Sequence, residues 1–373
     1  MEIKGINTKG ESIVIETEGS KIKSVSKSNH NIKDLLIPGF VDRHSHGGYG
    51  YDFMDGSKEK TEKFLKKILS EGCTSIVHTS ITAEEDDVER AVKNANYFIE
   101  EKPSGIAEMV GIHIEGNYLT EEKKGAHRSD LFKPLTIEEV NKLNKWSKNI
   151  KVITYAIEKS TTEVTKKLLN NGIRPSVGHS IATYDDVAKH LKVGLSTCTH
   201  LHNAMSGYSH RRENMGIVNA AYNLYKNNLM SELIVDGIHV DREVVKDTYN
   251  IIGPKSVIAI TDSIRPKGAK DGEYESGGLK VFKKGLYIRT ERGEIAGSGQ
   301  SMIGNFNNLL EFTNCSLDEA VMMTSTNASR ELNLKNKGEL KAGFDADILV
   351  LENNNNKYTV KRTIVRGLEG YKI

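Results

Sequence analysis

The sequence predicts an α/β protein: a TIM-like (β/α)8 barrel that carries a small β-sandwich domain built from both chain ends. Three observations lead to this prediction. Eight short apolar runs alternate with segments of helical periodicity between about residues 39 and 262, an alternation typical of a parallel sheet with helical crossovers. Eight strands suit a barrel of roughly 250 residues. The two chain ends instead alternate apolar and polar residues, which predicts antiparallel strands.

The apolar runs give the expected strands in chain order. The first ends in His44-Ser45-His46, and the others span residues 75–78, 109–114, 152–155, 176–178, 197–200, 232–235 and 257–260. Apolar side chains at helical spacing predict helices over residues 58–70, 137–146 and 162–170. Period-two segments such as 12–16 and 347–351 predict strands at both ends. We therefore expect a small domain of residues 1–37 and 340–373, with a barrel domain of residues 38–339 inserted into it.

Composition argues against several classes of partner. The 373 residues include 52 Lys and Arg against 50 Asp and Glu, a formal charge of +2, which offers no electrostatic surface for nucleic acid. The cysteines Cys73, Cys198 and Cys315 are few and scattered, as in proteins of a reducing compartment. No apolar run is long enough to span a membrane, and the first residues do not resemble a signal peptide. We expect a soluble, cytoplasmic protein without a nucleic-acid or membrane partner.

Histidines and carboxylates gather where the expected strands end. His44 and His46 are two residues apart and therefore share one face of a strand, although an isolated pair of this kind is a weak signal. Four further strand ends are followed by Glu115, His179, His200 and Asp262. The C-terminal strand ends of a barrel face the active site, and imidazole and carboxylate ligands suit zinc, iron or similar metals. The sequence therefore predicts a metal-dependent enzyme.

Eight motifs occur in order along nearly the whole chain. They are Pro38-Gly39-Phe40-Val41-Asp42 with His44-Ser45-His46-Gly47-Gly48, His113-Ile114-Glu115-Gly116, Lys124-Gly125-Ala126-His127, Gly178-His179-Ser180-Ile181-Ala182-Thr183-Tyr184, Thr199-His200-Leu201-His202-Asn203-Ala204-Met205, Asp236-Gly237-Ile238-His239-Val240, Ile260-Thr261-Asp262 and Ala296-Gly297-Ser298. Together they are specific: the sequence resembles the amidohydrolase superfamily and, within it, the N-acetylglucosamine-6-phosphate deacetylases. The resemblance implies a barrel with a β domain, a homodimer, and hydrolysis of the acetamide of an N-acetylated hexosamine 6-phosphate to the amino sugar phosphate and acetate.

The resemblance also implies how metal is held. Glu115, His179 and His200 match the ligands of the main ion. His44 and His46 match the branch of the family that binds a second ion, with Glu115 bridging the two. One or two divalent ions per subunit are therefore expected, with zinc and iron as the first candidates, and the sequence leaves their number and identity open.

Two further residues match the catalytic groups of the family. Asp262 matches the carboxylate that takes a proton from the attacking water and gives it to the departing amine. His127 matches the residue that polarises the carbonyl oxygen together with the metal, which stabilises the charge that develops in the transition state.

The resemblance places the substrate phosphate near three matched residues, Asn203, Ala204 and His239. In the family an arginine from the partner subunit completes this site, usually within Arg-Glu-Pro-Gly. This chain has an insertion there and lacks the proline, so either Arg211 or Arg212 can fill the role. Both offer the planar fork that suits phosphate oxygens. Two solvated arginines on a loop remain the alternative.

Three residues beside ligand positions depart from the family pattern: Asn117 replaces a proline, His202 a Tyr or Phe, and Ser263 an alanine. They leave the hexosamine epimer and the exact N-acyl substrate open. His202 would share a strand face with His200 and is a second candidate for that metal position, although the motif favours His200. Two other functions also stay open: an amidohydrolase for another N-acyl or cyclic amide substrate, and a non-catalytic binding protein with the same fold.

Overall fold

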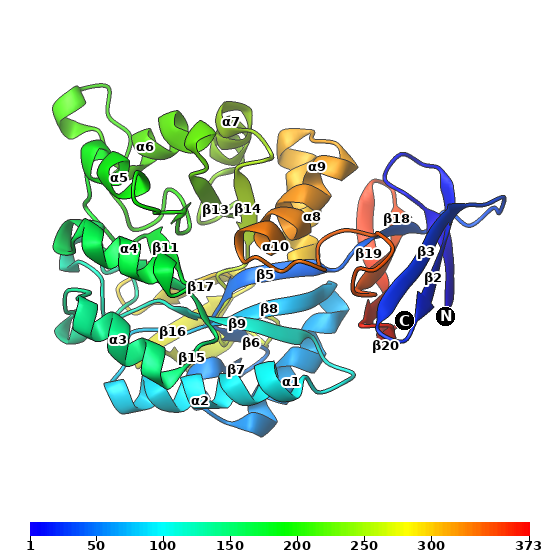
Figure 1. Cartoon of the computed structure of the whole chain (residues 1–373), viewed down its shortest axis with the longest axis horizontal. Helices are drawn as coiled ribbons and strands as arrows, with labels where there is room; N and C mark the ends of the chain where they lie inside the picture. Colours follow the sequence, from blue (N-terminus) through cyan, green and yellow to red (C-terminus); the bar gives the residue numbers. More distant parts are fainter.

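The structure, a computed structural model, describes residues 1–373 and consists of a barrel beside a smaller sheet that contains both chain termini (Figure 1). Eight parallel strands form the barrel sheet and follow one another in chain order. They are β5 (Phe40–Ser45), β8 (Cys73–Thr79), β9 (Glu108–Ile114), β10 (Ile150–Tyr155), β11 (Arg174–Val177), β12 (Thr197–Cys198), β13 (Met230–Ile234) and β14 (Val257–Ile260). The eight strands expected from the apolar runs are all present, which confirms the predicted fold class.

The barrel closes between its first and last strands, β5 and β14. The Asp262 N–H donates to the His44 carbonyl at 2.9 Å, and the His46 N–H donates to the Ser263 carbonyl at 2.8 Å. Closure therefore brings the end of β14 against the two histidines at the end of β5. Apolar side chains from six of the barrel strands form one buried cluster together with two residues from near the C-terminal end of the barrel domain, and branched aliphatic residues are usual at such positions: Val41, Val77, Val110, Val152, Ile234, Ile258, Ile260, Ala328 and Leu332.

Helices surround the barrel strands (Figure 1). They are α1 (Lys58–Lys67), α2 (Glu85–Glu101), α3 (Ile137–Trp146), α4 (Thr162–Asn170), α5 (Tyr184–Leu191), α6 (Ile217–Leu224), α7 (Arg242–Ile252), α8 (Met302–Thr313), α9 (Leu317–Val321) and α10 (Asn327–Glu331). The helices expected over 137–146 and 162–170 have these bounds. The helix expected over 58–70 ends at Lys67 and continues as a 3-10 turn to Glu71, because Gly72 adopts φ 79° and ends it.

The smaller sheet joins strands from both ends of the chain. Hydrogen bonds connect seven strands in one sheet: β20 (Leu368–Lys372), β19 (Lys357–Val365), β18 (Ile348–Asn354), β4 (Leu35–Pro38), β1 (Glu2–Ile6), β2 (Ser12–Glu18) and β3 (Lys21–Lys27). Side chains from all of these strands except β20 meet in a separate apolar cluster, so the sheet folds over its own core. The expected pairing is antiparallel, and all pairs follow it except β1 with β4, which is parallel. The expected sandwich is therefore one continuous sheet.

A third sheet follows β14 and was not expected from the sequence. Its antiparallel strands are β15 (Gly272–Ser276), β16 (Leu279–Lys284) and β17 (Tyr287–Thr290). Most of its side chains are at least partly exposed, so the sequence carries little of the apolar signal that marks buried strands. The chain leaves this sheet through Ile295, Ala296 and Gly297, which line the active-site pocket. No helix has the length and apolar character that crossing a membrane would require.

Candidate active site

The C-terminal ends of five barrel strands bring the predicted metal ligands and the catalytic carboxylate together. His44 lies on β5 and His46 directly after it, and the others follow β9, β11, β12 and β14: Glu115, His179, His200 and Asp262. His179, His200 and Asp262 adopt positive φ angles of 46°, 32° and 48°. Left-handed backbone costs a non-glycine residue about 1–2 kcal/mol, and such strain concentrates at functional sites. The chain thus turns sharply at three of the six positions.

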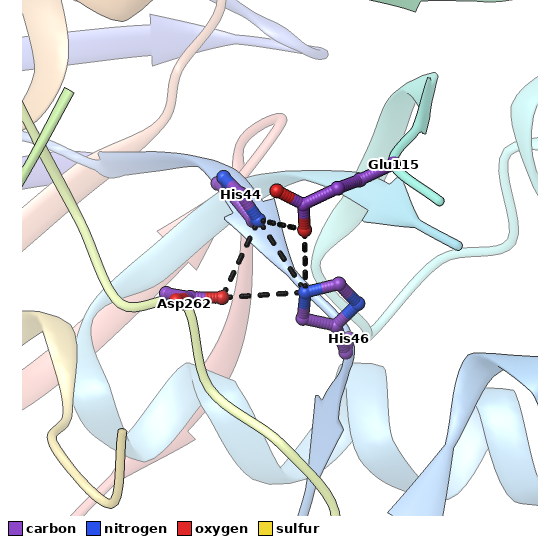
Figure 2. A group of neighbouring side chains, drawn as sticks. All are labelled: His44, His46, Glu115 and Asp262. Atoms are coloured by element: carbon purple, nitrogen blue, oxygen red, sulfur yellow. Dashed lines mark hydrogen bonds and ion pairs between the residues drawn. The ribbon is translucent and has the colours of Figure 1, made fainter. Parts of the chain in front are cut away.

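Four of these side chains converge on one point (Figure 2). Glu115 Oε2 lies 3.0 Å from His44 Nε2 and 3.1 Å from His46 Nε2. Asp262 Oδ1 lies 3.3 and 3.2 Å from the same two nitrogens. The nitrogens themselves are 3.4 Å apart. Two imidazole nitrogens and two carboxylate oxygens therefore face a common centre.

The other carboxylate oxygen of Glu115 faces a second pair of histidines. Glu115 Oε1 lies 3.0 Å from His200 Nε2 and 3.6 Å from His179 Nε2. The two rings meet edge to face with centroids 4.9 Å apart. Glu115 thus stands between two histidine pairs and offers one oxygen to each.

This donor set fits divalent metal ions. Within each of the two groups the ligand atoms all lie within 4.8 Å of one another, and neutral imidazole with carboxylate is the ligand chemistry of zinc, iron and similar ions. Burial alone would lower the pKa of His46, but Asp262 and Glu115 outweigh it and raise that pKa to about 9. Without a cation, protons on His44 and His46 thus balance the negative charge of the two carboxylates. A metal ion replaces such protons when it binds.

Backbone and side-chain acceptors orient the ligand rings. His179 Nδ1 donates to the Lys123 carbonyl at 2.7 Å, which turns Nε2 toward Glu115. His44 Nδ1 donates to Glu232 Oε2 at 3.0 Å in the same way. Partners of this kind fix the tautomer of a metal-binding histidine. Burial lowers the pKa of His179 to about 4, so this ring is neutral and its Nε2 is free to bind a cation at pH 7.

A pocket of about 290 Å³ opens onto this cluster. His46, Glu115, His179, His200 and Asp262 line it, whereas His44 lies buried behind them. His127, the predicted carbonyl-polarising residue, is also in the pocket wall. A volume of this size suits a small-molecule ligand.

His127 is held in a defined orientation. The Asn117 N–H donates to Thr82 Oγ1 at 3.2 Å, and the Thr82 hydroxyl lies 2.8 Å from His127 Nδ1. The Thr82 hydroxyl can donate to Nδ1, and with that donation the ring proton of His127 is on Nε2. Burial lowers the pKa of His127 well below its usual range, so the ring is neutral.

The predicted phosphate-binding residues divide into two sets. Asn203, Ala204 and His239 line the pocket, and the Asp236 carboxylate holds His239 Nδ1 at 2.7 Å. Arg211 and Arg212 do not line it. Arg212 pairs with Asp185 and stacks on Tyr184 with its guanidinium carbon 4.7 Å from the ring centroid. No arginine of the same chain therefore completes the pocket.

His202 is not a metal ligand in this arrangement, which answers the question that the sequence left open. The strand expected over 197–200 ends at Cys198, and residues 199–202 form turns instead. His202 has φ 82°, and its Nε2 lies 2.9 Å from Thr248 Oγ1, away from Glu115. The shared strand face with His200 was therefore a wrong expectation, because the chain leaves the strand before both residues.

Sequence reasoning missed a charged group behind the ligands. Glu232 on β13 and Arg43 on β5 are fully buried and form an ion pair of 2.9 Å. Burial alone would raise the pKa of Glu232, but Arg43 and His44 outweigh it and lower that pKa to about 2. A charged residue inside the otherwise apolar strand β13 was the available signal, since buried charges require partners.

Comparisons with known proteins show which family the chain is similar to. The sequence pattern of the amidohydrolase family matches residues 35–369. An N-acetylglucosamine-6-phosphate deacetylase of Bacillus subtilis is 34% identical over 371 residues, which cover 97% of this chain and 91% of that protein. An N-acetylgalactosamine-6-phosphate deacetylase of Escherichia coli O157:H7 is 31% identical, with coverage of 86% and 84%.

Solved structures show the same similarity in three dimensions. The crystal structure of N-acetylglucosamine-6-phosphate deacetylase from Thermotoga maritima superimposes with a TM-score of 0.91 at 30% identity, and the match covers 100% of both chains. The family match spans most of the sequence, and the fold agrees over its whole length. The chain therefore belongs to the amidohydrolase family, within its N-acetylglucosamine-6-phosphate deacetylase branch.

Proposed function

We propose that the protein is a metal-dependent deacetylase that hydrolyses the acetamide of N-acetylglucosamine 6-phosphate, or of a close N-acetylhexosamine 6-phosphate, to the amino sugar phosphate and acetate. The observation that carries the proposal is the cluster of two histidine pairs, Glu115 and Asp262, onto which the pocket opens. The similarity to deacetylases over 97% of the chain supports the reaction class. Three buried, free cysteines support a cytoplasmic location.

We propose two divalent ions per chain, zinc or iron, bridged by Glu115. Glu115, His179 and His200 would hold one ion, and Glu115, His44 and His46 would hold the other, since each group brings its donor atoms together. A divalent cation in this site supplies Lewis-acid chemistry, which promotes ionisation of a water molecule and polarises the amide carbonyl. The protein supplies the ligands, the proton transfers and the orientation of the substrate.

Asp262 is the proposed proton carrier. Its side chain is 15% exposed, whereas the Glu115 side chain is 1% exposed, so of these two carboxylates in the pocket lining Asp262 is the more accessible. Burial alone would raise its pKa, but His44 and His46 outweigh it and hold the pKa well below its usual value. The carboxylate is therefore ionised and able to accept the proton of the attacking water. Its second task is to return that proton to the amide nitrogen, because an amine anion is a poor leaving group.

His127 is the proposed donor to the amide oxygen. The Thr82 hydroxyl occupies Nδ1, and the neutral ring then carries its proton on Nε2. A donor aimed at an oxygen that gains charge stabilises the transition state more than the ground state.

For the phosphate, we propose contacts with Asn203, Ala204 and His239 of one chain and with Arg211 or Arg212 of the partner in a homodimer.

The substrate claim is tested by comparing acetate release from four sugars. The metal-loaded protein is given N-acetylglucosamine 6-phosphate, N-acetylgalactosamine 6-phosphate and the two unphosphorylated sugars. We expect release from at least one phosphorylated sugar and little from either unphosphorylated one. Equal turnover with and without phosphate contradicts the phosphate site, and no release from metal-loaded protein contradicts the substrate class.

The role of Asp262 is tested with Asp262→Asn. The amide keeps the shape of the side chain but cannot take the proton, so we expect kcat to fall by about 10²–10⁴-fold. Metal analysis is the control, because the ion held by Glu115, His179 and His200 does not need Asp262 and should remain. Activity close to that of the wild type with metal bound contradicts the proton-carrier role.

A further inference from the structure

A fully buried carboxylate lies behind the histidine pair of β5. Glu232 on β13 is 0% exposed, and its Oε2 accepts a hydrogen bond from His44 Nδ1 at 3.0 Å. The same oxygen accepts the backbone N–H of His200 at 3.3 Å. The Leu201 N–H also bonds to the Glu232 carbonyl at 2.8 Å, so the turn at His200 has a main-chain anchor as well. The turn at His200 thus has a second anchor besides the Glu232 side chain, whereas His44 Nδ1 is held by that side chain alone.

The other oxygen of Glu232 faces a buried cation. Arg43 Nε lies 2.9 Å from Glu232 Oε1, and Arg43 Nη1 lies 2.8 Å from Glu331 Oε2. Glu331 at the end of α10 also accepts hydrogen bonds from Ser196 and Thr197. This arrangement fixes the orientation of the Glu232 carboxylate, because one oxygen is committed to Arg43 and only the other is available to His44.

His44 is thus clamped between two carboxylates through its two ring nitrogens. Nδ1 is held by Glu232, while Nε2 points at Glu115 Oε2 and Asp262 Oδ1. A histidine binds metal through a nitrogen without a proton, and the partner of its other nitrogen decides which one that is. We propose that Glu232 is a positioning residue for metal binding: it keeps the ring proton on Nδ1 of His44, so that Nε2 is the ligand of the second ion. This inference rests on the proposed two-ion site.

The competing explanation is that Glu232 only neutralises Arg43. The substitution Glu232→Gln distinguishes this explanation from the positioning role, because an amide has one accepting oxygen and one donating NH2 group. Arg43 has only donors, so the amide oxygen faces Arg43 and the amide NH2 faces His44 Nδ1. The histidine then carries its proton on Nε2, where it blocks the ion. Removing Arg43 as well frees the amide to turn its oxygen toward His44.

The experiment measures metal content and affinity rather than turnover. Each protein is stripped with a chelator and titrated with Co²⁺, followed by visible absorption and by metal analysis after desalting. For Glu232→Gln we expect the affinity for the second ion to fall about 10–100-fold, while the first ion remains. Arg43→Met with Glu232→Gln should recover the second ion. Glu331→Gln is the matched control: it weakens the same buried network without touching His44 and should keep both ions.

A second pair of variants keeps the proposal testable if the Glu232→Gln protein does not fold. Arg43→Met combined with Glu232→Gln or with Glu232→Leu removes both buried charges in each case, and only the glutamine can accept from His44. We expect the glutamine version to bind the second ion at least tenfold more tightly than the leucine version. Equal affinity overturns the role of Glu232, as does wild-type affinity in Glu232→Gln. A single ion in the wild-type protein overturns the two-ion site itself. This outcome is distinguished from failure of the Glu232 role because it is seen before any substitution is made.

Discussion

At the residue scale, the site depends on which nitrogen of each histidine carries the proton. His179 and His127 are both buried and neutral, yet the proposed mechanism gives them opposite tasks. The Lys123 carbonyl accepts a hydrogen bond from the Nδ1–H of His179, which leaves on Nε2 the lone pair that the proposed metal site requires. When the Thr82 hydroxyl donates to Nδ1 of His127, Nε2 carries the proton that the proposed mechanism directs at the substrate. The Lys123 carbonyl and the Thr82 hydroxyl thus favour opposite imidazole tautomers, one with a lone pair on Nε2 and one with a proton there.

We predict that Thr82→Val lowers kcat roughly tenfold, less than the 10²–10³-fold expected when an oxyanion donor is removed outright. Valine keeps the shape but offers no proton to His127 Nδ1, so the donating tautomer is no longer imposed. Steady-state kinetics with metal-loaded protein measure the effect. Thr82→Ser is the matched control and should retain most of the activity, because it keeps the hydroxyl. A Thr82→Val protein as active as Thr82→Ser would contradict this account of His127.

At the element scale, the strands were predictable and the turns after them were not. Buried strands such as β9 and β14 are rich in apolar residues, and Glu115 and Asp262 follow their last residues within two positions. These strands and the site candidates after them could therefore be located from the sequence. The end of β12 could not, because His200 turns away at φ 32° through contacts with Glu232, which lies 32 residues along the chain. The sheet of β15–β17 was missed because its strands are largely exposed. The domain limits inferred from the two chain ends stay a prediction.

The barrel and the small sheet are joined by a buried ion cluster. Lys337 Nζ lies 2.7 Å from Glu108 Oε2 at the start of β9 and 2.6 Å from Asp347 Oδ2 just before β18. Asp345 Oδ2 lies 3.2 Å from the same nitrogen. Burial alone would raise the pKa of Glu108, but Lys337 and Lys102 outweigh it and lower that pKa below 4.5. Because the folded pKa is depressed, this carboxylate stabilises the fold above about pH 4.5, and the contribution is lost as the pH falls through the folded pKa.

We therefore predict that Glu108→Gln lowers the melting temperature at pH 7, corresponding to about 1–3 kcal/mol for the lost charged contact. The difference from the wild type should shrink as the pH is lowered below about 4.5, because the wild-type carboxylate then becomes protonated. Melting curves of both proteins between pH 7 and the acid limit measure this. A difference that grows on acidification would contradict the assigned direction of the pKa shift.

At the scale of the whole molecule, the predicted metal ligands of one chain come together at one pocket, and no arginine lines that pocket. Arg212 is engaged by Asp185 and Tyr184 of its own chain. Arg211 is exposed and contacts only neighbouring loop groups, among them His210 at 3.4 Å. Arg211 is therefore the stronger candidate to reach the pocket of a second chain.

We predict that Arg211→Ala raises KM for the phosphorylated sugar. Mixing this variant with the inactive Asp262→Asn variant should restore part of the activity. In a dimer of one Arg211→Ala chain and one Asp262→Asn chain, the first has an intact pocket and the second supplies its arginine. Random mixing gives such dimers half of the time, with one working site each, so about a quarter of the wild-type activity should return. No recovery on mixing would contradict an arginine that crosses between chains. The same test with Arg212→Ala decides whether Arg211 or Arg212 is that arginine.

The central claim is that this pocket hydrolyses an amide through bound metal, and metal removal tests it most directly. Acetate release from N-acetylglucosamine 6-phosphate is measured on one preparation before chelation, after chelation, and after stepwise return of Zn²⁺ or Fe²⁺, with metal content determined at each step. We predict loss of activity on chelation and recovery that follows occupancy of the site, without loss of folded structure. Acetate release that persists in folded, metal-free protein would contradict the account.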